Sequence, residues 1–150
     1  MVLANGAIAP AVSLTDQHGV PTPLVRGDGP RLVVFYPFAF SGVCTGELAE
    51  LNEQADDLGG ADVVAVSCDA MFANRAFSDA QGLSFPLLSD FWPHGEVCRA
   101  FDAFDEERGC PARTTVLLDA EGVVRWSVQS PIGEARSLAE YRSAVAGLSS

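Results

Sequence analysis

The chain has 150 residues, of which 48% are hydrophobic, and this length is enough for one globular domain with a buried core. Twenty acidic residues against nine basic ones, all of them arginine, give a formal net charge of -11 and exclude the basic surface that nucleic acid requires. The first residues do not resemble a signal peptide, and no apolar stretch approaches the length of a membrane span. We therefore expect a single cytoplasmic domain over residues 1–150 with neither nucleic-acid nor membrane partners.

The predicted elements begin with a hairpin and a central strand. Residues 11–24 surround a polar turn at 16–19, which predicts two short antiparallel strands. The run RLVVFY, from Arg31, is apolar and β-branched, as is typical of a strand buried on both faces. A helix follows, because apolar residues recur at steps of three and four positions before Gly59 and Gly60 end it. These apolar residues are Leu48, Leu51, Ala55 and Leu58.

Strands and helices alternate in the rest of the chain. The last helix begins at Ser137, with Glu140 placed for a capping box. The other predicted ranges are a strand at 62–67, a helix at 71–82, a strand at 85–88, a helix at 95–101 and a hairpin at 114–128 that turns at 120–122. Parallel crossovers in the middle and hairpins toward the two ends predict a thioredoxin-like α/β sandwich, in which helices flank a central mixed sheet.

The segment YPFAFSGVCTGELAEL, residues 36–51, places Cys44 at the start of the first predicted helix. If Ser41 is the N-cap, Cys44 is the third helical residue, beside N–H groups that have no partner within the helix. These donors and the helix dipole favour a thiolate and lower a cysteine pKa from its free value of about 8.5. Pro37 lacks an N–H and fixes its own φ, so the loop presents other donors to a ligand. A buried apolar cysteine is the simpler alternative, but position and flanking residues favour a nucleophile.

The spacing of Pro37, Ser41 and Cys44 resembles the active-site motif of the peroxiredoxins, in which the hydroxyl residue is more often threonine. The resemblance covers nearly the whole chain and includes VVAVSCD and PARTTVLLDAEGVVRW. The segments FPLLSDFWPHGEV and YPFAFSGVCTGEL are similar to the bacterial one-cysteine subgroup called alkyl hydroperoxide reductase E. This resemblance implies a thiol-dependent peroxidase that reduces hydrogen peroxide and organic hydroperoxides. It also implies a homodimer or larger homo-oligomer with no metal or organic cofactor.

The resemblance assigns roles to particular residues. Cys44 becomes the peroxidatic cysteine, Ser41 the hydroxyl that binds peroxide and thiolate, and Pro37 the residue that shields the pocket. Arg113 places a guanidinium beside the sulfur, and the N–H groups of Val43 and Cys44 act with it. The thiolate attacks one peroxide oxygen in line with the O–O bond, so these donors must lie along the axis on which charge develops.

Glu47 matches the acid that the family carries one turn after the cysteine, and we place it with Val43 in the substrate-binding part of the site. Both Glu47 and Arg113 also have simpler interpretations. A surface arginine at a strand start pairs with any nearby carboxylate, and composition alone favours this for Arg113. An acid in the first turns of a helix is stabilising whatever its role. The resemblance reverses the first interpretation and leaves the second open.

The other cysteines, at positions 68, 98 and 110, are expected to be reduced thiols. No metal site is expected, because the four cysteines include no Cys-x-x-Cys pair and the two histidines are scattered. We expect an external thiol to reduce the Cys44 sulfenic acid, either a small thiol or a mycoredoxin- or thioredoxin-like protein. Cys68 or Cys110 is a conditional resolving partner, and Cys98 is assigned to the core. The alternative function is a redox sensor or binding protein that relays Cys44 oxidation to a partner without efficient turnover.

Overall fold

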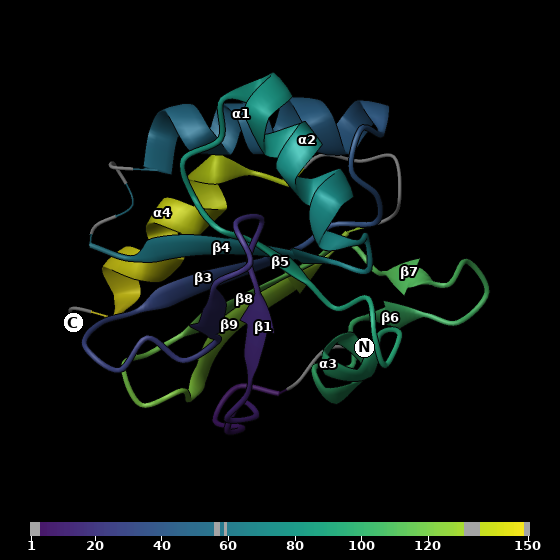
Figure 1. Ribbon diagram of the computed structural model, residues 1–150. Coiled ribbons are helices and arrows are strands. Elements are labelled where there is room, and N and C mark those ends of the chain that lie inside the picture. Colours follow the sequence, from purple (N-terminus) through teal and green to yellow (C-terminus); the bar gives the residue numbers. More distant parts are fainter. Residues whose placement is uncertain (1–3, 56–57, 59, 131–135, 149–150) are drawn as a thin grey trace.

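Seven strands form one mixed sheet in the order β2-β1-β5-β4-β3-β8-β9 (Figure 1). The computed structural model describes residues 4–55, 58, 60–130 and 136–148, and of Val43 and Cys44 it describes the backbone alone. The helices are α1 (Gly42–Gln54), α2 (Met71–Gln81), α3 (Glu96–Ala100) and α4 (Leu138–Gly147). The strands are β1 (Ser13–Thr15), β2 (Pro21–Pro23), β3 (Arg31–Phe35), β4 (Asp62–Ser67), β5 (Leu87–Ser89), β6 (Phe104–Asp105), β7 (Cys110–Pro111), β8 (Thr114–Leu118) and β9 (Val124–Gln129).

The centre of the sheet is built from strands that are buried on both faces. β3 runs parallel to β4 and antiparallel to β8, and all five of its residues are buried. β4 continues parallel to β5, while the N-terminal hairpin of β1 and β2 joins β5 in the antiparallel sense. The long apolar runs inside the central strands follow from this burial, since neither face meets solvent.

Helices cover both faces of the sheet. Residues of α1, α2 and α4 pack with Leu32, Val34 and Ala65 in one core cluster, so these helices share a face (Figure 1). Residues of α3 pack with Val33 and Val64 in a second cluster on the opposite face. Because side chains alternate along a strand, successive residues of β3 enter different clusters. This arrangement confirms the predicted thioredoxin-like sandwich.

Some predicted boundaries are wrong. α1 ends at Gln54, and Ala55 is its C-cap, so the helix stops several residues before Gly59, which lies outside the described residues. Leu58 is nevertheless only 1% exposed and belongs to the same core cluster as Leu48 and Leu51. The spacing of the apolar residues therefore predicted their burial correctly, but it predicted too long a helix for α1. The short β6–β7 pair was not predicted.

The edge strand β2 consists of Pro21, Thr22 and Pro23. The Leu24 N–H donates to the Val12 carbonyl, which lies on the β1 side. Since alternate residues of an antiparallel strand direct their polar groups to opposite sides, both prolines face away from β1. At the other edge of the sheet, β9 pairs with β8. Among the described residues, no helix has the length and apolarity needed to cross a membrane.

Candidate active site

The loop between β3 and α1 connects the centre of the sheet to the start of the helix. Pro37 is buried, whereas Phe38 and Phe40 are exposed. The Ala39 N–H donates to Asp69 Oδ2 at 2.8 Å, which ties the loop to the segment after β4. Phe40 has a φ of 67°, a left-handed conformation that disfavours a non-glycine residue by about 1–2 kcal/mol. Its ring packs edge-on against the ring of Phe77 in α2, with 5.1 Å between the two ring centroids, and this contact helps to hold the loop.

Ser41 is the N-cap of α1, as predicted, but its hydroxyl does not cap the helix. The residue is extended, with φ of −74° and ψ of 150°, and its side chain accepts no bond from the first turn. The hydroxyl instead donates to the Phe38 carbonyl at 2.8 Å. The expectation of a side-chain cap is therefore wrong. The oxygen lone pairs of Ser41 can still accept a hydrogen bond from a ligand.

Cys44 is the third residue of α1, counted from Gly42. The first turn of a helix carries N–H groups without intrahelical partners and the positive end of the helix dipole. The side chains of Cys44 and Val43 lie outside the described part of the chain. Their roles therefore stay predictions.

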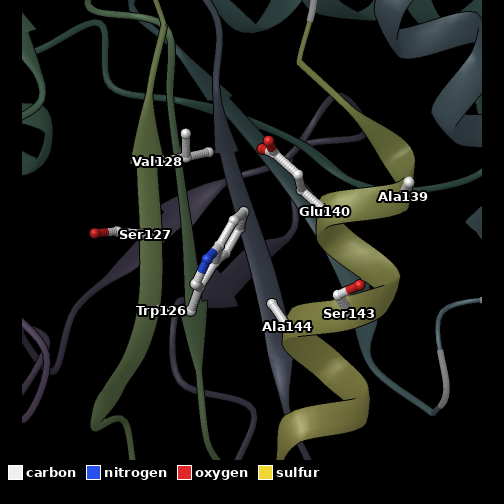
Figure 2. Close-up of a pocket in the computed structure, with 7 residues that line it drawn as sticks. All are labelled: Trp126, Ser127, Val128, Ala139, Glu140, Ser143 and Ala144. Carbon is white, nitrogen blue, oxygen red and sulfur yellow. The ribbon is translucent and has the colours of Figure 1, made fainter.

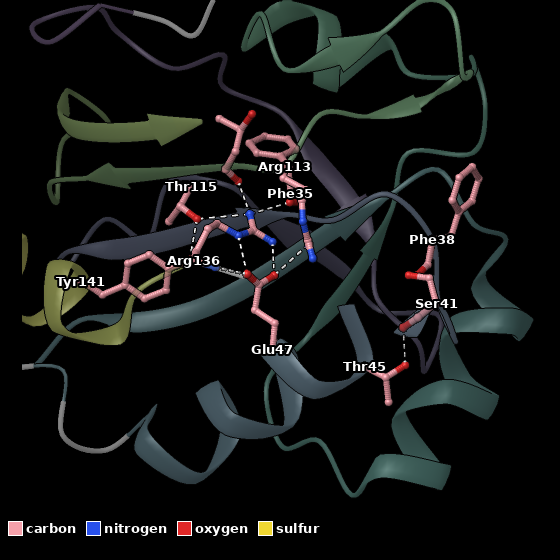
Figure 3. A network of polar contacts seen from close by, with 10 residues as sticks. Phe35, Phe38, Ser41, Thr45, Glu47, Arg113, Thr115, Arg136 and Tyr141 are labelled. Carbon is pink, nitrogen blue, oxygen red and sulfur yellow. Dashed lines mark hydrogen bonds and ion pairs between the residues drawn. The ribbon is translucent and has the colours of Figure 1, made fainter. Parts of the chain in front are cut away.

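Glu47 lies one helical turn after Cys44, and its carboxylate contacts two arginines (Figure 3). Residues three positions apart lie on the same face of a helix. Arg113 Nη1 donates to Glu47 Oε1 at 3.1 Å. Arg136 donates to Oε2 from its backbone N at 2.6 Å and from Nε at 3.0 Å, and to Oε1 from Nη2. The carboxylate therefore accepts four hydrogen bonds, of which three come from Arg136.

Arg113 is 1% exposed, so its interpretation as a surface arginine is wrong. Its position follows from the sheet register, in which Phe35 at the end of β3 pairs with Thr114 at the start of β8. This pairing sets Arg113 beside the strand end from which the loop leads to α1. The sequence placed Arg113 near the site through the family motif alone, and the structure supplies the contact with Glu47.

Arg136 was missed by the sequence analysis. It is buried just before α4, and its Nη1 donates to the carbonyls of Phe35 at 2.7 Å and Thr114 at 2.8 Å. The same nitrogen lies 3.2 Å from Thr115 Oγ1, which is hydrogen-bonded to the Tyr141 hydroxyl at 2.8 Å. Its carboxylate partner, Glu47, is 89 positions away in the sequence. The residues around Arg136 form no motif from which this contact could be predicted.

The network shifts two pKa values. Burial alone would raise the pKa of Glu47, but the hydrogen bonds and charge of Arg136, together with the charge of Arg113, outweigh it and lower that pKa. Burial raises the pKa of the Tyr141 phenol. At neutral pH the described part of the network is thus one carboxylate between two guanidinium groups, held near the first turns of α1.

The other cysteines are buried thiols, and none of the three is in a disulfide. Cys68 and Cys98 lie beside each other with Asp90, and their ligand atoms are all within 4.8 Å of one another. The burial of Cys98 is as expected, but its neighbours were not anticipated. Both cysteines belong to the core cluster on the α3 face of the sheet, whereas α1 packs on the other face. The resolving roles suggested for Cys68 and Cys110 stay predictions.

A hollow of about 620 Å³ lies between β9 and α4, and the described residues that line it include none from α1. Figure 2 shows Trp126 and Val128 directed toward α4 and Ser127 directed away from it. The residues that line this hollow include no cysteine or histidine. It therefore offers no nucleophile, and we do not assign the chemistry to it.

Thioredoxin-like proteins that place a cysteine in the first turn of the helix after a central strand are thiol oxidoreductases, and this chain has that arrangement. The AhpC/TSA family matches residues 5–127, and the chain belongs to this family. It is 36% identical over 151 aligned positions to alkyl hydroperoxide reductase E of Mycobacterium tuberculosis, an alignment that covers 98% of this chain and 99% of the relative.

Solved structures agree with this assignment. Peroxidoxin BcpB from Mycobacterium tuberculosis superposes with a TM-score of 0.88 at 26% identity, over 99% of both chains. AhpC of Enterococcus faecalis has a TM-score of 0.87 at 24% identity, over 99% of this chain and 93% of that one, and it supports the fold. The protein is a peroxiredoxin, and its activity is that of a thiol-dependent peroxidase.

Proposed function

We propose that Cys44 is the peroxidatic cysteine and that it reduces hydrogen peroxide and organic hydroperoxides through a sulfenic acid. The observation that carries this proposal is the contact between Arg113 and Glu47. Because Glu47 is one turn from Cys44, the guanidinium of Arg113 lies at the face of α1 that carries the cysteine. The names of the relatives as alkyl hydroperoxide reductases support the substrate class.

Two physical effects favour a thiolate at Cys44. The unpaired N–H groups of the first turn of α1 and the helix dipole stabilise an anion there. The guanidinium groups of Arg113 and Arg136 both contact Glu47, one helical turn from Cys44, and a nearby positive charge lowers a cysteine pKa further. No histidine base is needed under these conditions.

The reaction then takes place in two stages. The Cys44 thiolate attacks one oxygen of the hydroperoxide, an S–O bond forms, and the O–O bond breaks. The departing oxygen takes a proton and leaves as water or an alcohol, while Cys44 becomes a sulfenic acid. An external thiol attacks the sulfenic sulfur with loss of water, and a second thiol releases Cys44 as a thiol together with a disulfide.

The surrounding residues would position the peroxide. The Ser41 hydroxyl donates to Phe38, so it is oriented to accept the O–H of a hydroperoxide through its lone pairs. Arg113 and the N–H groups of Val43 and Cys44 would stabilise the charge on the departing oxygen. Buried Pro37 adds no N–H to the loop and would keep water from the sulfur.

A steady-state assay of peroxide consumption with a thiol reductant tests this assignment. We expect Cys44→Ser to abolish turnover and Cys98→Ser, which changes the cysteine assigned to the core, to retain it. Serine is nearly isosteric with cysteine, so the circular dichroism spectrum of each variant should match that of the parent. Normal turnover by Cys44→Ser would overturn the assignment. Stoichiometric oxidation of Cys44 without turnover, whatever thiol is supplied, would instead favour a redox sensor.

We also propose a cytoplasmic single domain that associates as a homodimer or larger homo-oligomer. The buried cysteines Cys68 and Cys98 are thiols that form no disulfide, which suits a reducing compartment. A hollow of about 350 Å³ is lined by Phe72, Phe91 and Trp92, which are 76%, 52% and 83% exposed. Exposed aromatic groups of this kind mark association surfaces. Sedimentation of Trp92→Asp should show a shift toward monomer, and an unchanged mass would exclude this face.

A further inference from the structure

Two cysteines and an aspartate meet at the carboxyl ends of neighbouring strands. Cys68 directly follows β4, Asp90 directly follows β5, and Cys98 lies in α3. The Asp90 N–H donates to the Ser67 carbonyl at 2.8 Å, which keeps the two strand ends together. The two Sγ atoms and a carboxylate oxygen are all within 4.8 Å of one another. Asp90 and Cys98 are 2% and 0% exposed, and Cys68 is 7% exposed.

The Asp90 carboxylate is held in place by backbone donors. Oδ2 accepts from the Cys98 N–H at 2.8 Å, and Oδ1 accepts from the Val97 N–H at 3.2 Å. Each carboxylate oxygen has a second lone pair that these bonds leave available. Ligating carboxylates in metal sites are oriented by hydrogen bonds of this kind. The oxygen is therefore fixed beside the two sulfurs before any ion arrives.

We infer that Cys68, Asp90 and Cys98 form a binding site for a divalent cation of the zinc class. Two thiolates with one carboxylate are ligands that zinc accepts, and a fourth position can hold water. Zinc–sulfur bonds of about 2.3 Å and zinc–oxygen bonds of about 2.1 Å place tetrahedral ligands roughly 3.6–3.8 Å apart. The 4.8 Å limit exceeds this by about 1 Å, a gap that rotation of the cysteine side chains closes.

Charge balance supports the same ion. Two thiolates and a carboxylate carry three negative charges, which a divalent cation reduces to one. The guanidinium of Arg99 lies near Cys68 and Asp90 and screens the remaining charge, although its main partner is Glu106, which accepts from Arg99 Nε at 2.9 Å. A buried cluster with this balance avoids the large penalty of an uncompensated charge.

The site is separate from the proposed peroxidase site. Cys68 and Cys98 belong to the core cluster on the α3 face, and α1 packs on the other face of the sheet (Figure 1). A bound ion fastens α3 to the ends of β4 and β5. It also keeps both cysteines coordinated as thiolates and so less available for oxidation by the peroxide that the enzyme consumes.

A cobalt titration tests the inference, because cobalt(II) occupies zinc sites and its thiolate complexes absorb in the near ultraviolet. The titration uses the reduced Cys44→Ser protein, which lacks the other proposed thiolate. This protein should bind one equivalent of cobalt(II) and show a thiolate-to-cobalt charge-transfer band. Loss of a residue that only hydrogen-bonds a metal ligand typically weakens metal binding about 10–100-fold. Cys68→Ser or Cys98→Ser removes a ligand itself, so the affinity for cobalt should fall on the order of 100-fold or more. Cys110→Ser is the matched control and should bind as the parent does.

A melting experiment on the unsubstituted chain avoids any folding defect of the variants. Zinc at about 100 times its dissociation constant should raise the melting temperature by roughly 5–10 °C, and a chelator should reverse the rise. The inference is overturned if zinc produces no rise. Cobalt binding that is equally tight in the parent, Cys68→Ser and Cys98→Ser would overturn it too.

Discussion

Glu47→Gln should cause a large loss of stability, because it removes the only carboxylate that contacts the buried arginines among the described residues. The substitution keeps the size of the side chain but removes its charge. A glutamine oxygen can replace one carboxylate oxygen, but its amide group turns donors toward Arg113 or Arg136. Those arginines have side-chain exposures of 1% and 0%, so water cannot compensate them.

The size of the effect follows from this burial. Removing one partner of a buried ion pair typically destabilises a protein by about 3–5 kcal/mol, since the remaining charge stays desolvated. For a chain of this length, each kcal/mol lost from the free energy of unfolding lowers the melting temperature by about 2–4 °C. We therefore expect the melting temperature to fall by roughly 6–20 °C. The variant should be folded at 25 °C only if the parent stability lies well above the loss, and urea titrations measure both.

The pH dependence separates this mechanism from a packing defect. The folded-state pKa of Glu47 lies below the ordinary glutamate value of 4.5, so the stabilising contribution of Glu47 is complete above that value. The contribution is lost as pH falls through the folded-state pKa. The difference in unfolding free energy between parent and Glu47→Gln should therefore shrink in acid. Glu50→Gln, on the same helix but exposed, should change stability by less than about 0.5 kcal/mol. A loss below about 1 kcal/mol in Glu47→Gln, or one that persists unchanged in acid, would refute the reasoning.

Three further predictions concern the reaction. Arg113→Ala should slow sulfenic acid formation about 100-fold and raise the Cys44 pKa, and an unchanged stopped-flow rate across pH would remove Arg113 from the mechanism. Ser41→Thr should leave activity nearly unchanged, whereas Ser41→Ala should lower it. The alanine variant should lose less than about 1 kcal/mol of stability, because the Ser41 hydroxyl does not cap α1. Full activity in the alanine variant would leave Ser41 with a structural role only. After one equivalent of peroxide, intact mass should show added oxygen at Cys44; prompt loss of two hydrogens, abolished by Cys68→Ser or Cys110→Ser, would name a resolving cysteine instead.

The parts of the fold that were predicted correctly depend on local sequence. The run from Leu32 to Phe35 is apolar because both faces of β3 are buried, and that pattern is visible in any short window. The helix that begins after Ser137 was found from its cap, and the Ser137 hydroxyl does accept from the Glu140 N–H. Cys44 was placed in the first turn of α1 for the same reason: the N-cap position of Ser41 is a local signal.

The parts that were missed depend on contacts between distant residues. Arg136 meets Glu47 across 89 positions, and nothing near Arg136 specifies a buried carboxylate partner. Cys68, Asp90 and Cys98 come from a strand end, a loop and a helix, so they lack the short spacing by which metal sites are recognised. Arg113 shows the intermediate case: a family motif located it, but only the β3–β8 register explains its burial.

The prolines of β2 determine how copies of this chain are able to meet. An open sheet edge with free N–H groups is a template onto which another chain can add a strand. On the outer side of β2 the donors would come from Pro21 and Pro23, and proline has none to offer. A second copy arriving there finds no N–H donor, and the Pro23 carbonyl already accepts from Arg31 Nη1, so the sheet cannot grow continuously in that direction. Strand pairing between copies is therefore expected at the β9 edge beyond Val124, which is already hydrogen-bonded to Gly6 and Ala7, and an interface formed by one edge alone closes as a symmetric pair.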